Sequence, residues 1–141
     1  GYPLDQNLYQ TVKGISAAAR VVEEGGAILV ASESSDGGPD HGNFADIMQM
    51  GDSPGAVLKS IYDLEQPILD QWQAQILAGI LEQADVRVYS RMEQADIRSC
   101  KLAVAEDLDG VLRELIEAVG KGARVAVLPD GPLTIPYVER G

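Results

Sequence analysis

The chain has 141 residues, and its 22 acidic and 11 basic side chains give a formal charge of -11 at pH 7. This acidic surplus disfavours binding to nucleic acids and to anionic membranes, because both attract clustered lysine and arginine. No apolar run approaches the roughly 20 residues that a membrane-spanning helix needs. The length and the 45% apolar content instead suit a single domain with a buried core.

The chain contains one cysteine, Cys100, and one histidine, His41. A single thiol rules out an internal disulfide framework, and a single imidazole rules out a histidine-rich metal site. We therefore expect no metal ligands in this chain. The absence of a signal peptide predicts a cytoplasmic protein, and the start at Gly1 predicts a portion of a longer chain.

The first predicted element is a helix from about Asp5, its N-cap, to Glu24, where Gly25-Gly26 ends it. Apolar side chains recur along it at spacings of three and four residues, which predicts one buried stripe. The stripe consists of Leu8, Val12, Ile15, Ala19 and Val22. Residues 26–31 follow as an apolar run without alternation, which is typical of a buried parallel strand.

A turn-rich loop over residues 34–42 and three helices are predicted next. The first helix covers residues 44–50, and the second begins at Ser53, the cap, with Pro54 in its first turn. The third runs from Pro67 to about Ala84. The side chains predicted to share one side of it are Ile68, Gln71, Trp72, Gln75, Ile76, Gly79 and Ile80.

The second half of the chain alternates strands and helices. Strands are predicted at residues 86–89, 102–105 and 124–128, with helices at 92–98 and 108–120 between them, and the tail after residue 128 has turn chemistry. This alternation predicts one α/β domain of Rossmann-like character, with three layers and a mostly parallel sheet of roughly four strands. The Gly-x-Gly-x-x-Gly fingerprint of dinucleotide-binding folds is missing.

Candidate site residues fall at the carboxyl edge of this predicted sheet, where helix N-termini and ligands of α/β folds meet. Tyr9, Gln10 and Lys13 lie in the first turns of the first helix, on an arc away from its apolar stripe. Trp72 lies in the second turn of the helix that opens at Pro67. The residues alone leave a second interpretation open, in which the Tyr9 face is simply solvated and Trp72 belongs to the core.

A family resemblance adds to this interpretation. The string Gly-Tyr-Pro-x-Asp-x-Asn-x-Tyr-Gln-x-x-Lys-Gly at residues 1–14 resembles the opening of the C-terminal domain of nickel-dependent lactate racemases. The resemblance covers nearly the whole chain. Further matching segments are Glu24-Gly25-Gly26, Ser35-Asp36-Gly37 with His41-Gly42, Asp70-Gln71-Trp72, Gln75-Ile76-Leu77 and Leu128-Pro129-Asp130-Gly131.

Members of that family have two α/β domains with the active site between them. The resemblance implies a nickel pincer cofactor, a thiolated pyridinium mononucleotide attached to a lysine of the N-terminal domain. It also implies a racemase or epimerase that acts on a 2-hydroxy acid by reversible hydride transfer, with its acid/base histidines in that other domain. The partners implied are therefore a small 2-hydroxy acid and the N-terminal catalytic domain.

The resemblance places the other wall of the cleft in this chain. Lys13 aligns with a catalytic-site lysine that contacts the substrate carboxylate, and Tyr9 and Gln10 align with residues that line the substrate pocket. Trp72 aligns with a tryptophan near the cofactor. His41 lies in a variable loop and receives no catalytic part. Gly14, in mid-helix, suggests close approach by another backbone, such as that of the missing domain.

The sequence therefore predicts the C-terminal, substrate- and cofactor-contacting domain of such a racemase, which alone would fold without turnover. A non-catalytic α/β ligand-binding or regulatory module, such as a receiver domain, is the alternative. Receivers carry clustered acids at strand ends and a lysine after the last strand. Here the last predicted strand is followed by Pro129-Asp130 without that lysine. A purely structural interaction domain is the third option.

Overall fold

Three parallel strands, in the order β1-β2-β3, form the centre of the computed structural model, which describes residues 1–37 and 42–138. The strands are β1 (Ala27–Ala31), β2 (Asp85–Tyr89) and β3 (Ala103–Val104). The α-helices are α1 (Leu8–Ala19), α2 (Phe44–Met48), α3 (Pro54–Tyr62), α4 (Gln71–Leu81), α5 (Gln94–Ser99) and α6 (Leu108–Val119). Two single turns of 3-10 helix follow, η1 (Gly120–Gly122) and η2 (Gly131–Leu133).

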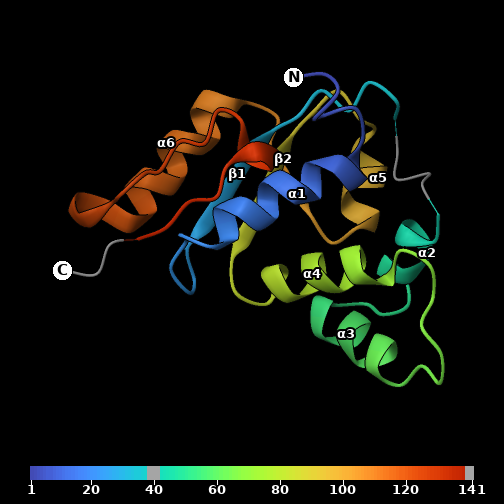
Figure 1. Ribbon diagram of the computed structural model, residues 1–141. Helices are drawn as coiled ribbons and strands as arrows, with labels where there is room; N and C mark the ends of the chain where they lie inside the picture. Colours follow the sequence, from blue (N-terminus) through green and yellow to red (C-terminus); the bar gives the residue numbers. More distant parts are fainter. Residues whose placement is uncertain (38–41, 139–141) are drawn as a thin grey trace.

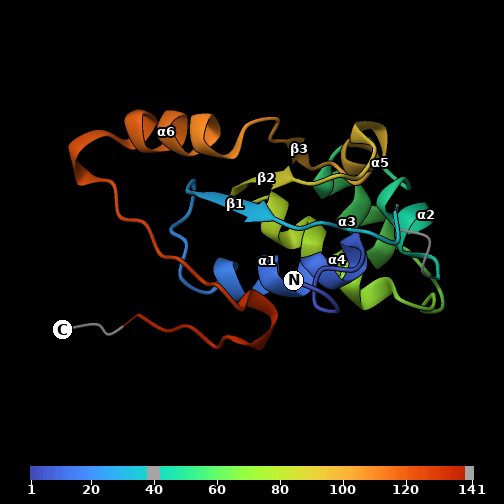
Figure 2. The ribbon, with the colours of Figure 1, turned by 90° about the horizontal axis from the view of Figure 1, so that it is seen from above.

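The register of the sheet confirms the predicted parallel arrangement. β1 pairs with β2 from Ala27 opposite Asp85 to Ala31 opposite Tyr89, and β2 pairs with β3 only around Val88. Figure 2 shows the strands between α1 and α4 on one side and α6 on the other. The α/β class is therefore confirmed, with helices on both sides of the strands.

The predicted fourth strand is wrong. The described residues form a three-stranded sheet, and Val125 and Val127 are 56% and 79% exposed. After η1 the chain runs past the edge of β1 to the far side of α1 (Figures 1 and 2). There η2 packs on α1, and a Cβ on Gly131 would lie only 3.3 Å from Cα of Gly14. A valine-rich segment forms a strand only where a neighbouring edge receives it, and this tail is anchored on a helix instead.

This contact also identifies the backbone that approaches Gly14. The approach was expected, but the backbone belongs to the chain's own tail rather than to another domain. The ring of Pro132 lies over the same glycine, 3.5 Å from where a Cβ would stand.

The N-cap of helix α1 is two residues later than predicted. Asn7, not Asp5, is the N-cap: its backbone is extended and its Oδ1 accepts a 3.0 Å hydrogen bond from the Gln10 backbone N–H. The Asp5 carboxylate instead accepts from the Glu33 backbone N–H at 3.2 Å. The predicted apolar stripe is confirmed over its first three members, since Leu8, Val12 and Ile15 are fully buried, whereas Ala19 and Val22 are partly buried.

Helix α4 is shorter than predicted and buries a different side. It begins at Gln71 because Asp70 adopts a left-handed backbone conformation (φ 66°), which an α-helix excludes. Its buried residues are Gln73, Ala74, Leu77 and Ala78. The two alanines allow α4 to pack closely against α1, α2 and α3, while Trp72 and Ile76 are exposed.

Within the described residues, no helix is both long and apolar enough to cross a membrane.

Candidate functional site

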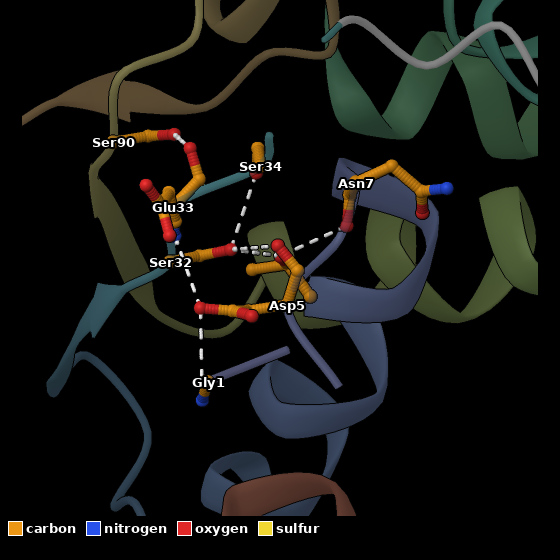
Figure 3. Close-up of polar contacts among 8 residues, drawn as sticks. Gly1, Asp5, Asn7, Ser32, Glu33, Ser34 and Ser90 are labelled. Atoms are coloured by element: carbon orange, nitrogen blue, oxygen red, sulfur yellow. Dashed lines mark hydrogen bonds and ion pairs between the residues drawn. The ribbon is translucent and has the colours of Figure 1, made fainter. Parts of the chain in front are cut away.

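The N-terminus of α1 is joined to the carboxyl end of β1 by a network of hydroxyl groups (Figure 3). Ser32, the residue after β1, lies 2.6 Å from the Thr11 hydroxyl and 3.1 Å from the Ser34 hydroxyl. The Ser32 hydroxyl also donates to the Asp5 backbone carbonyl at 3.4 Å. The first turn of α1 therefore lies at the carboxyl edge of the sheet, as the sequence predicted.

Tyr9 is the centre of the candidate site. Its ring meets the ring of Trp72 edge-to-face, with centroids 6.2 Å apart and an interplanar angle of 85°. On another side it meets the buried ring of Phe44 in the same way, at 6.0 Å and 82°. The Lys13 Nζ lies 5.8 Å from the Tyr9 ring centroid, within the range of a cation–π contact. The structure thus brings together three of the four predicted side chains.

Trp72 stands in the first turn of α4 and is 53% exposed, so it is not a core residue. Its helix is tied to α1 by the buried Gln73, whose Nε2 donates to the Tyr9 backbone carbonyl at 3.0 Å. This side-chain bond to the backbone fixes the first turn of α4 beside the first turn of α1. The exposed indole is therefore presented by a rigid pair of helices.

Asp70 also belongs to this site, although sequence reasoning assigned it no role. The Tyr9 hydroxyl donates to Asp70 Oδ1 over 3.5 Å. Burial, and then the charge and hydrogen bond of Asp70, raise the pKa of Tyr9 above its ordinary value, so the phenol keeps its proton. Its position in the sequence could have pointed to it, because Asp70 directly precedes Gln71-Trp72 in one of the segments that resemble the family. We call Tyr9, Lys13, Asp70 and Trp72 the Tyr9 cluster.

Two other residues singled out in the sequence stand apart. Gln10 is half-buried on the same turn of α1. Among the described residues, the ring and cation contacts of the Tyr9 cluster do not involve its side chain. His41 lies outside the described residues.

A hollow lies at the carboxyl ends of the strands, apart from the Tyr9 cluster, and sequence reasoning missed it. Its lining includes Asp5, Glu33, Ser90, Arg91 and Glu106, with none of the four predicted site residues. Arg91 donates to the Glu33 carboxylate at 2.9 Å. The Ser90 hydroxyl donates to the Glu33 carbonyl (Figure 3). The sequence does offer a clue to this hollow, because Glu33 comes two residues after the end of β1 and Arg91 comes two residues after the end of β2.

The donor groups of the described residues do not suit a metal centre. Residues 1–37 and 42–138 contain no group of three or more His, Cys, Asp and Glu side chains placed to hold a metal ion. Cys100 is fully buried, and burial raises its pKa to about 11, which keeps the thiol protonated. The groups suited to a bound organic molecule are the exposed indole of Trp72 and the ammonium of Lys13. An aromatic face covers a flat ring, and an ammonium attracts a carboxylate or phosphate.

Comparisons with known proteins converge on one family. The family model described as "Lactate racemase C-terminal domain" matches residues 1–135. The chain is 37% identical over 137 residues to a lactate racemase of Lactiplantibacillus plantarum and 34% identical over 134 residues to one of Thermoanaerobacterium thermosaccharolyticum. Each match covers 93% of this chain and 31% of the relative.

A solved structure shows the same similarity in three dimensions. The lactate racemase apoprotein from Thermoanaerobacterium thermosaccharolyticum superimposes with a TM-score of 0.84 at 31% sequence identity. The match covers 100% of this chain and 34% of that chain. The chain thus spans about a third of the length of the relatives it matches.

Proposed function

This chain belongs to the lactate racemase C-terminal domain family, and from that premise we propose that it forms one wall of a 2-hydroxy-acid racemase or epimerase. The remaining catalytic groups belong to a separate N-terminal domain of the parent enzyme. The substrate is lactate or a related 2-hydroxy acid, and the reaction is a reversible hydride transfer at its 2-carbon. We place the parent enzyme in the cytoplasm.

The gathering of Tyr9, Lys13 and Trp72 on one face carries this proposal. The three residues come from two helices and are separated by up to 63 positions (72 - 9) in the chain, yet they meet around the Tyr9 ring. Their face is exposed, so a second domain has access to it. The resemblance assigns substrate and cofactor contacts to these same residues.

In this proposal Lys13 holds the substrate carboxylate. Its side chain is exposed, and its ammonium lies over the Tyr9 ring; within residues 1–37 and 42–138 it forms no ion pair with a carboxylate. When a second domain covers the face and excludes water, the attraction between ammonium and carboxylate strengthens, because the local dielectric constant falls. Tyr9 and Gln10 then line the pocket and orient the substrate by hydrogen bonding.

Trp72 is the proposed cofactor contact. The nickel pincer nucleotide, when bound, supplies the acceptor and donor of the hydride. The resemblance assigns the metal ligands to the other domain. The half-exposed indole has the flat apolar surface that shields a reacting centre from water.

Replacing Lys13 in the complete, cofactor-loaded enzyme tests the proposal. Lys13→Ala is expected to lower kcat/KM for lactate at least tenfold, which corresponds to about 1.4 kcal/mol of barrier. Lys59→Ala removes an exposed lysine on α3 that is not part of the Tyr9 cluster, and is the matched control that should retain activity. If Lys13→Ala lowers kcat/KM less than tenfold, Lys13 does not have the proposed role of holding the substrate carboxylate.

The chain alone is expected to fold but not to racemise lactate. Circular dichroism would report the fold, and polarimetry or a chiral assay would report turnover. Turnover by the isolated chain would contradict the proposed division of labour between two domains.

A further inference from the structure

Asp70 has a backbone conformation that ordinary helix capping does not explain. It is one of three non-glycine residues with positive φ in the described chain, at φ 66° and ψ 5°. Such left-handed conformations are uncommon outside glycine, although aspartate and asparagine tolerate them best. The Asp70 side chain makes no capping hydrogen bond to α4, the helix that it precedes. Its carboxylate is therefore used elsewhere.

The carboxylate lies between the Tyr9 hydroxyl and Gly42. Its Oδ1 accepts from Tyr9 over 3.5 Å. On the other side, a Cβ on Gly42 would collide with Oδ2 and displace the carboxylate, and Gly42 also has a positive φ of 58°, which favours glycine. Beside it, Asn43 Nδ2 donates to the backbone carbonyl of Leu69 at 3.4 Å. The Asp70 carboxylate thus lies against the Tyr9 phenol on one side and against Gly42 on the other.

We propose that Asp70 is a positioning residue that holds the Tyr9 phenol between the Lys13 ammonium and the Trp72 indole. The contact itself stands on the geometry above. Its effect on substrate rests on the proposed function. Asp70 directly precedes Gln71, the first residue of α4. The short segment of residues 70–72 therefore positions both the Tyr9 hydroxyl and the Trp72 ring.

The contact between Asp70 and Tyr9 can be measured through the pKa of the Tyr9 phenol. The Asp70 carboxylate and burial oppose formation of the phenolate, whereas the Lys13 ammonium over the ring favours it. Asp70→Asn keeps a hydrogen-bond acceptor and a residue that tolerates the left-handed backbone, and it removes only the charge.

The first experiment titrates Tyr9 in this chain without any assay of activity. Phenolate absorbance near 295 nm is followed in wild type and in Asp70→Asn, each as a difference from the same protein carrying Tyr9→Phe. Far-UV circular dichroism at each pH restricts the comparison to the folded protein. The pKa of Tyr9 is expected to fall in Asp70→Asn, and an unchanged pKa overturns the proposal.

The second experiment measures kcat and KM of the complete enzyme in a double-mutant cycle. Asp70→Gly, which relieves the backbone conformation but removes the carboxylate, is expected to lower kcat/KM for lactate at least fivefold. In a Tyr9→Phe background the same change should have less than a twofold effect, because Asp70 acts through the hydroxyl.

Additive effects of the two changes overturn the positioning role. Asp63→Asn, at an exposed aspartate after α3, is the control that should leave kcat/KM unchanged. If the complete enzyme has no racemase activity at all, the proposed function fails, and the titration alone decides the role of Asp70.

Discussion

Helices α1 and α6 are both twelve residues long and both amphipathic, yet only α1 is buried. Helix α1 places Leu8, Val12 and Ile15 in the core, where it contacts β1, α4 and the η2 turn. Helix α6 has no buried residue. It lies on the opposite side of the strands, with part of its length beyond the end of the sheet (Figure 2).

The difference teaches that amphipathic spacing predicts a helix but not the surface that covers it. Helix α1 meets a sheet on one side and a second helix on another, while α6 meets mainly the edge strand β1. The site follows the same division, since the Tyr9 cluster stands on the well-packed pair α1 and α4. Rigid support of this kind is what a binding site requires.

Two matched isoleucine substitutions give the sharpest test of the comparison. Ile15→Ala in α1 removes a fully buried side chain and should lower the free energy of unfolding by about 2–5 kcal/mol. Ile116→Ala in α6, where the side chain is 38% exposed, should cost about 1 kcal/mol or less. Urea denaturation followed by circular dichroism measures both. Equal costs would show that α6 is as well packed as α1.

Cys100 reports on the packed region through its reactivity. Because burial raises its pKa to about 11, only roughly a thousandth of the thiol is ionised at pH 8, and the reactive species is the thiolate. We expect alkylation by iodoacetamide to be at least a hundredfold slower in the native protein than in urea. Mass spectrometry of timed samples measures the two rates. Rapid native labelling would place Cys100 outside the core.

Removing the helix caps should lower stability less than the isoleucine substitution in α1, with the same contrast between α1 and α6. Asn7→Ala removes the cap of α1 and should cost about 1 kcal/mol, partly offset because the buried Asn7 Nδ2 has no hydrogen-bond partner in the described residues. Asp107→Ala removes the corresponding cap of α6, where Asp107 accepts from the Asp109 and Gly110 N–H groups. Its effect on global unfolding should be smaller. Amide hydrogen exchange should instead show fraying confined to α6.

Local patterns predicted most of the fold. Apolar spacing located α1 and its buried stripe, a continuous apolar run located β1, and the alternation of strands and helices located β2 and predicted the parallel pairing. The patterns failed where distant contacts decide the outcome. Residues 124–128 have strand propensity, but the docking of Gly131 on Gly14 leads the tail away from the sheet edge. The buried side of α4 depends on alanines that fit beside α1. The spacing of apolar residues along the sequence does not reveal that fit.

The candidate site was predicted in part, for similar reasons. Helix N-termini placed Tyr9 and Trp72 at one edge of the sheet, and the structure brings them into contact. The role of Asp70 depends on a left-handed backbone and on the Gly42 loop, 28 residues earlier (70 - 42), so spacing alone could not reveal it. The Glu33–Arg91 hollow likewise joins residues from two strand ends.

The most direct test is a crystal structure of the complete enzyme with a bound 2-hydroxy acid or an unreactive analogue. The account predicts the ligand's carboxylate within about 4 Å of Lys13 Nζ, the distance of an ion pair, with Tyr9 and Trp72 facing the same cavity. A ligand bound in the Glu33–Arg91 hollow, with the Lys13 ammonium directed into solvent, would contradict it.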